Sequence, residues 1–244
     1  MPGGGTGVAV GAGISVCLVD LFTAPHRPVP GPSDGTLRDT VEKRRRPLLD
    51  SAVSAISCRS GNHSSHRLCE AVLKTIIFEA PRIIEDPNNY EARANIMWAG
   101  MLAHNNVCGV GRVQDWASHH IEHELSAMYD VTHGAGLAVI TPAWMRYVLK
   151  INPHKLVQFA TRVWDIEPQE TEEATALKGI EAFEAFLKKI GMPLTFEEIG
   201  AKAEDIDRMT EKLLGKRKTE GNYVKLASDD VKKIYHFAAE RKPE

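Results

Sequence analysis

Apolar side chains recur every three or four positions from about residue 67 to the end of the chain, which is the period of amphipathic α-helices. The first stripe consists of Leu68, Val72, Ile76 and Ile77, and we expect its helix to end near Pro81 because proline interrupts helical hydrogen bonding. The same period predicts further helices over residues 92–102, 116–129, 134–148, 156–163, 171–190, 206–214 and 228–239. Little of this region has the alternation typical of strands, so residues 67–241 are predicted to form one all-α domain.

Residues at the expected helix ends agree with this pattern. Gly191 and Pro193 follow the long segment 171–190, which is the usual arrangement at a helix C-terminus. Ser228 is predicted to cap the last helix at its N-terminus, with Asp229 and Asp230 in the first turn.

Residues 1–66 have a different character. Residues 1–13 are rich in glycine, residues 24–35 contain four prolines, and residues 51–65 are rich in serine. No helical or alternating period lasts there for more than a few positions, so we predict an irregular or poorly ordered segment at 1–66, before a helical metal-binding domain at 67–244. His63 and His66 lie among serines at the end of this segment and are interpreted as solvated loop residues.

Histidines are concentrated in and after the predicted helix 116–129. On that helix His119 and His123 are four positions apart and therefore share a face, whereas His120 points elsewhere. Neutral imidazole nitrogens are good ligands for Zn²⁺ and Fe²⁺, so the spacing predicts a metal or catalytic site.

His133 follows this helix and precedes Gly134 and Gly136, where the backbone can turn sharply. We therefore expect a loop histidine that supplies a further ligand to the same divalent metal.

Composition excludes few classes of function. The chain is 43% hydrophobic and 25% charged with a formal net charge of −2, so no basic excess indicates a nucleic-acid or anionic-membrane partner. The apolar stretch 8–22 is too short and too interrupted for a membrane span. Four cysteines occur without a C-x-x-C pair, which favours neither a disulfide framework nor a zinc knuckle and suggests a cytoplasmic protein.

Several longer motifs occur in order along the helical region. They are Glu70-Ala-Val-Leu-Lys-Thr, Asn89-Tyr-Glu-Ala-Arg-Ala-Asn-Ile-Met-Trp-Ala, Gln114-Asp-Trp-Ala-Ser-His, His123-Glu-Leu-Ser-Ala-Met-Tyr-Asp, His133-Gly-Ala-Gly-Leu-Ala-Val-Ile-Thr-Pro-Ala-Trp-Met and Phe159-Ala-Thr-Arg-Val-Trp. Together they resemble the iron-containing (group III) alcohol dehydrogenases, most closely the branch of butanol dehydrogenases and broad aldehyde reductases. The resemblance covers residues 67–241.

The resemblance implies the helical C-terminal domain of that fold and a dehydrogenase that uses NAD(P) with Fe²⁺ or Zn²⁺. His119 and His133 fall on two metal ligands of the family, and His123 falls on the histidine near the nicotinamide. A small alcohol or aldehyde would be the substrate, and a homodimer is implied. Asp130 and Thr132 are candidates for orienting His133, with turn positions as the alternative.

The sequence departs from the family upstream. The family has an N-terminal nucleotide-binding α/β domain that this chain is too short to include, so we expect a truncated and impaired enzyme. Arg46 and Asp50 stand where the family has the Asp and His of an Asp-x-x-x-His helix, and an arginine cannot bind a cation.

Two alternatives stay open. An inactive helical remnant would retain half of the metal ligands and no nucleotide domain. A zinc metallopeptidase is the other, because His119, Glu122 and His123 match the pattern H-x-x-E-H, in which the glutamate activates water. His133 separates the interpretations, since only the dehydrogenase requires it as a ligand.

Overall fold

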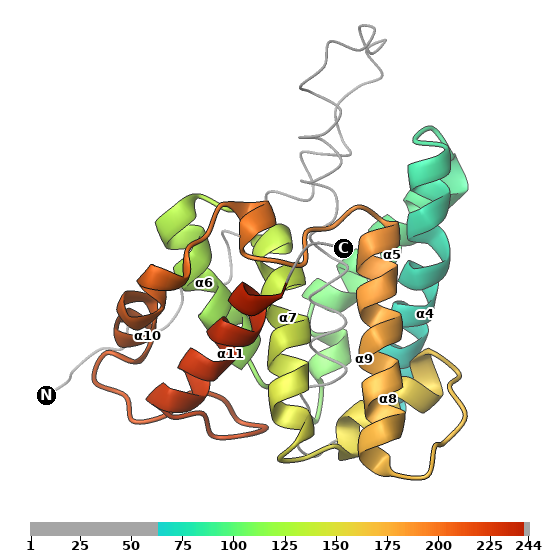
Figure 1. The fold of residues 1–244 in the computed structure, drawn as a ribbon. Helices are drawn as coiled ribbons and strands as arrows, with labels where there is room; N and C mark the ends of the chain where they lie inside the picture. Colours follow the sequence, from blue (N-terminus) through green and yellow to red (C-terminus); the bar gives the residue numbers. More distant parts are fainter. Residues whose placement is uncertain (1–62, 242–244) are drawn as a thin grey trace, which may run out of the picture. The chain divides into compact units, whose positions relative to one another are not determined.

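Helix α7 (His133–Leu149) is the apolar centre of the structure, a computed structural model that describes residues 63–241. Its residues are buried over almost the whole length, as expected for a helix that is apolar on every side. Helices α6 (Ala117–Tyr129), α9 (Glu172–Lys189) and α11 (Ser228–Glu240) pack directly against it, as Figure 1 shows.

The remaining helices form pairs around this centre. Helices α4 (His63–Glu85) and α5 (Tyr90–His104) form an antiparallel hairpin, α8 (His154–Val163) packs on α9, and α10 (Ile206–Leu214) packs on α6 and α11. Short 3₁₀ turns occur at Val107–Gly109 (η1), Glu197–Ile199 (η2) and Ala203–Asp205 (η3). Within residues 63–241 no strand forms beyond a single bridge between Glu220 and Leu226, so the all-α prediction is confirmed there.

The two prolines within helices do not end them. Helix α4 continues through Pro81 to Glu85, so the predicted end near Pro81 is wrong, and α7 likewise continues through Pro142. Ala80 is buried and Ile83 packs against the core on either side of Pro81. The free energy gained by burying these neighbours offsets the loss of the one backbone hydrogen bond that the proline removes.

The residues that end α9 agree with the sequence prediction, whereas the residue that caps α11 differs from it. The Thr171 hydroxyl accepts a hydrogen bond from the Ala174 amide at 3.1 Å, and Gly191 after the helix has a positive φ of 70°. At α11 the N-cap is Ala227, so the prediction of Ser228 is wrong by one residue. The Asp230 carboxylate accepts from the Ala227 amide at 2.8 Å, and a side chain within the first turn thus replaces the expected cap.

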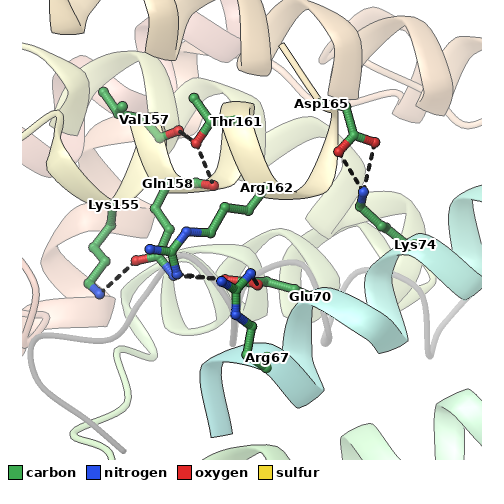
Figure 2. A network of polar contacts seen from close by, with 9 residues as sticks. All are labelled: Arg67, Glu70, Lys74, Lys155, Val157, Gln158, Thr161, Arg162 and Asp165. Atoms are coloured by element: carbon green, nitrogen blue, oxygen red, sulfur yellow. Dashed lines mark hydrogen bonds and ion pairs between the residues drawn. The ribbon is translucent and has the colours of Figure 1, made fainter. Parts of the chain in front are cut away.

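A polar network joins α4 to α8 (Figure 2). The buried Glu70 carboxylate accepts hydrogen bonds from Arg67 at 2.9 Å, Gln158 at 3.0 Å and Arg162 at 3.3 Å. Burial raises the pKa of Glu70, but these three donors outweigh it and hold the pKa below its usual range. Lys74 and Asp165 form a second link at 2.6 Å on the exposed side of the same interface.

Helix α4 begins at His63 and therefore includes the last four residues of the segment 1–66 that was predicted to be irregular. The division of the chain into domains at residue 66 stays a prediction. The predicted irregular segment is otherwise outside the described residues. His66 lies on α4 and is half-buried, contrary to its interpretation as a solvated loop residue. No helix in the described part of the chain has the length and apolar character needed to cross a membrane.

Gly179 allows α9 to approach α8 closely, which gives a test of the packing. A Cβ at this position would lie 2.6 Å from the Cβ and 2.9 Å from the Cα of Ala160, and a backbone contact cannot be relieved by a rotamer change. We expect Gly179→Ala to lower the free energy of unfolding by about 1–3 kcal/mol despite its better helix propensity. Urea unfolding measures this, with the exposed Glu181→Ala as a matched control. An unchanged or higher stability in Gly179→Ala would contradict the close approach.

His66 should make the stability of the fold depend on pH. Burial, then the charges of Lys155, Arg112 and Arg162, with Glu70 opposing, lower the pKa of His66 from 6.5 to about 4. Between these values the unfolded chain binds a proton that the folded protein excludes, so stability falls as pH drops from 6.5 towards 4. Replacing His66 with glutamine should flatten this slope in urea unfolding measured at several pH values. The exposed His154→Gln serves as the control, and equal slopes in all three proteins would refute the assignment.

Candidate functional site

The candidate site lies where α6 ends and α7 begins. Asp130 adopts the left-handed conformation with φ of 53° and donates its amide to the Ser126 carbonyl, which ends α6. The chain then turns within three residues, and His133 is the first residue of α7. His133, which was predicted to lie in a loop before the helix 134–148, is instead the first residue of that helix, and no sharp turn occurs at Gly134 or Gly136 because both are helical.

Two distant contacts fix the position of α6. The buried Asp115 carboxylate accepts from the Ala117 amide at 3.2 Å and from the Asn222 amide at 2.8 Å, which joins the start of α6 to the loop before α11. Burial raises the pKa of Asp115, although these backbone donors oppose the shift. Further along, the Tyr235 hydroxyl on α11 donates to the Ile121 carbonyl at 2.7 Å. The histidines on α6 are thus carried by a helix that is held at both its start and its middle.

Three imidazole rings converge at the junction. The ring of His133 lies 5.3 Å from that of His119 and 5.2 Å from that of His123, measured between centroids. His120 is turned to Glu220, with its Nδ1 2.8 Å from a carboxylate oxygen, as the helical spacing predicted. The structure therefore brings together the three histidines that the sequence singled out.

The three rings differ in their surroundings. His119 is 5% exposed and its ring makes an edge contact with Trp116, with centroids 4.8 Å apart. His123 is open to solvent on one side. Partial desolvation, together with the neighbouring His133, His119 and His120, lowers the pKa of His123, and the Glu122 charge only partly opposes this. A neutral imidazole that can accept a proton or bind a cation is the form favoured near neutral pH.

Glu122 connects the two helices beneath the rings. Its side chain is 0% exposed; one carboxylate oxygen contacts Nδ1 of His133 and the other accepts from the Ser126 hydroxyl. Ser126 Oγ also lies 3.0 Å from the Val131 carbonyl within the turn. Glu122 is therefore the residue that orients His133, rather than Asp130 or Thr132, and Thr132 caps α7 without a side-chain hydrogen bond.

Gly136 provides the room that this carboxylate needs. A Cβ on Gly136 would lie 2.3 Å from Oε1 and 2.7 Å from Cγ of Glu122. The glycine thus serves close packing between α6 and α7 and not a turn.

The donor atoms suit a divalent transition metal. Glu122, His123 and His133 each offer one ligand atom, and these atoms lie within 4.8 Å of one another. Imidazole nitrogen and carboxylate oxygen are common ligands of Zn²⁺ and Fe²⁺. Both oxygens of Glu122 are already engaged inside the protein, which favours an orienting role over direct binding. Arg46 and Asp50, at the upstream ligand positions, lie outside the described residues.

Sequence patterns point only weakly to Glu122 and not at all to Ser126. Glu122 belongs to the pattern H-x-x-E-H, and it follows Ile121 on the face of α6 that is buried. A carboxylate at a buried helical position requires a partner, and this is the signal that could have identified it.

Comparison with known proteins shows which family and which relatives this chain is similar to. The family model described as Fe-containing alcohol dehydrogenase family, C-terminal, matches residues 49–239. The probable NADH-dependent butanol dehydrogenase 1 of Bacillus subtilis is 39% identical over 169 residues, and NADH-dependent butanol dehydrogenase B of Clostridium acetobutylicum is 37% identical over 174. Each alignment covers 69% of this chain but only 43% and 44% of the relative, so the chain spans less than half the length of these relatives.

Solved structures show the same helical arrangement. NADH-dependent butanol dehydrogenase A from Thermotoga maritima superposes with a TM-score of 0.76 at 36% identity, over 84% of this chain and 53% of that one. The aldehyde reductase YqhD from E. coli has the same TM-score at 28% identity, over 82% of this chain and 53% of its own.

The contact between Glu122 and His133 predicts which ring nitrogen carries the proton. A carboxylate facing Nδ1 holds the proton there and leaves Nε2 as the ligand nitrogen, and a charge-assisted hydrogen bond contributes about 1.5–3 kcal/mol. In the metal-free Glu122→Gln variant, the preference of the His133 proton for Nδ1 over Nε2 should fall by at least roughly tenfold. Long-range ¹H–¹⁵N correlation of the histidine rings measures the tautomers.

Glu124→Gln provides the control for this experiment. Glu124 lies on the same helix and pairs with Lys212 at 3.0 Å, away from His133. Identical His133 ring shifts in the wild type and Glu122→Gln would show that Glu122 does not set the tautomer.

Proposed function

The chain belongs to the iron-containing alcohol dehydrogenase family, and we propose that the histidines at its α6–α7 junction form part of a metal-assisted dehydrogenase site. The reaction would transfer hydride between NAD(P)(H) and a primary alcohol or its aldehyde. The observation that carries the proposal is the convergence of the His119, His123 and His133 rings on one junction.

In this proposal His119 and His133 hold an Fe²⁺ or Zn²⁺ ion. When bound, such an ion acts as a Lewis acid that stabilises negative charge on the substrate oxygen, while NAD(P) supplies or accepts the hydride. The burial of His119 against Trp116 and the contact of His133 with Glu122 restrict both rings, so little orientational freedom is lost when they bind a cation.

His123 is assigned to proton transfer. It is the ring among the three that lies open to solvent, and its pKa is lowered, so it can accept the proton of an alcohol and pass it to water. In the reverse direction it would return a proton to the oxygen of the reduced aldehyde.

The metallopeptidase alternative has less support. It requires the glutamate of H-x-x-E-H to face a metal-bound water, but Glu122 is fully buried and its two oxygens contact His133 and Ser126. An orienting role for Glu122 accounts for the same residues without a water-facing carboxylate.

The finer assignments rest on likeness to the relatives. The relatives are named as butanol dehydrogenases and an aldehyde reductase, with NADH or NADPH. We therefore propose butanol or butyraldehyde as a suitable substrate, a homodimer and a cytoplasmic location. No residue of this chain is assigned to NAD(P). The chain spans less than half the length of the curated relatives, and a competent zinc site normally has three protein ligands, so metal binding must be tested apart from turnover.

Metal content and turnover of the purified chain test this proposal. We expect about one Fe²⁺ or Zn²⁺ per chain, with NADPH or NADH oxidation on butyraldehyde. His119→Ala and His133→Ala should each lose the metal and lower turnover by more than about 100-fold, since outer-sphere partners alone contribute 10–100-fold.

His120→Ala is the matched control because its ring faces Glu220 on the other side of α6. Metal bound equally by the wild type and both ligand variants would refute the site. Metal lost in the variants without turnover in the wild type would support the metal site and refute the activity, as the inactive-remnant alternative requires.

A further inference from the structure

A second reactive centre lies on α4, outside the histidine site. Cys69 on α4 and Cys108 in η1 are 39 residues apart in the chain, and each is 2% exposed. Neither forms a disulfide in the structure, and the Cys69 sulfur lies 3.5 Å from the Cys108 carbonyl oxygen. The fold therefore brings two cysteines together that the sequence shows as scattered.

Arg112 completes the cluster. Its Nη1 lies 2.5 Å from the Cys69 sulfur and 2.8 Å from the Cys108 carbonyl oxygen. A guanidinium at this distance stabilises a negative sulfur, and thiolates rather than thiols are the nucleophiles. The contact with Arg112 thus distinguishes Cys69 from an ordinary buried cysteine, which is inert.

The two sulfurs share their protons unequally. A hydrogen bond from the Cys108 thiol lowers the pKa of Cys69 to about 7; burial opposes this and Arg112 adds to it. The same hydrogen bond and burial raise the pKa of Cys108. With a pKa of about 7, a large share of Cys69 is thiolate near neutral pH while Cys108 keeps its proton, which is the combination of an attacking and a resolving cysteine.

We propose that Cys69 and Cys108, with Arg112, form a hydroperoxide-reactive thiol pair that closes an intramolecular disulfide. The Cys69 thiolate attacks one oxygen of the peroxide, the O–O bond breaks, and with one proton a sulfenic acid and water (or an alcohol, from an alkyl hydroperoxide) result. The Cys108 sulfur then attacks the sulfenic sulfur, the S–O bond breaks, and the hydroxyl leaves as water with the Cys108 proton. Two thiols are oxidised by two electrons and one peroxide is reduced.

This site is independent of the proposed dehydrogenase activity. The disulfide would link α4 to the segment that follows α5. In that segment the Val110 carbonyl already accepts a hydrogen bond from the Ser65 hydroxyl on α4. None of the three residues contacts His119, His123 or His133 among the contacts of the described chain. Success or failure of either proposal therefore leaves the other unaffected.

Thiol counting on the full chain tests the inference. The protein has four cysteines, and after treatment with excess hydrogen peroxide in the presence of a metal chelator we expect two thiols to remain. Non-reducing peptide mapping should identify the link between Cys69 and Cys108. The chelator excludes metal-catalysed oxidation as the source of the loss.

Matched variants make the outcome decisive. The Cys17→Ser/Cys58→Ser double variant should form the disulfide at the wild-type rate, whereas Cys69→Ser and Cys108→Ser should not form it. Arg112→Gln should slow thiol loss by about tenfold at pH 7, because less of Cys69 is thiolate. Circular dichroism checks that each variant is folded, and Arg112→Lys, which keeps the positive charge, should restore part of the rate.

Three results would overturn the proposal. One is retention of all four thiols in the folded wild-type protein after peroxide treatment. Another is a disulfide that involves Cys17 or Cys58 in place of Cys69 and Cys108. The third is an oxidation rate in folded Arg112→Gln equal to that of the wild type.

Discussion

The buried Glu122 carboxylate is the constraint on which the rest of the histidine junction depends. A carboxylate removed from water must be paired or hydrogen-bonded, and here the partners are the His133 ring and the Ser126 hydroxyl. The contact requires α6 and α7 to pack closely, which only a residue without a side chain at Gly136 permits. The orientation of a proposed metal ligand and the packing of two core helices are therefore one structural feature.

The hydrophobic core makes this polar arrangement possible. Helix α7 is apolar on every side and is surrounded by α6, α9 and α11, so its first residue, His133, has a fixed position at the edge of the core. Contacts of Asp115 with the loop before α11 and of Tyr235 on α11 also hold α6. Preorganisation of this kind matters for metal-assisted catalysis, because side chains that are already restricted lose little freedom on binding. His123, by contrast, lies at the open edge, where a proton can exchange with water.

The same fold holds a chemically distinct centre on α4. There the cationic Arg112 contacts the Cys69 sulfur, whereas at the α6–α7 junction the anionic Glu122 contacts the His133 imidazole. In each case a charged side chain that is distant in sequence or on another helix contacts the reactive atom. The domain thus contains two sites whose properties depend on helix packing and not on exposed loops.

By itself the sequence determined the helices, their approximate ends, the family, and the three histidines that meet at the junction. These follow from local information: the 3.6-residue period, residues such as Thr171 and Gly191 at helix ends, and motifs of consecutive residues. Only the tertiary structure decided that α4 continues through Pro81, that His133 begins a helix, that Glu122 and not Asp130 or Thr132 orients it, and that Cys69 lies beside Cys108. The physical reason is that each of these depends on burial and on contacts between separate helices, and a local pattern specifies which face of a helix is apolar but not which side chain it will meet.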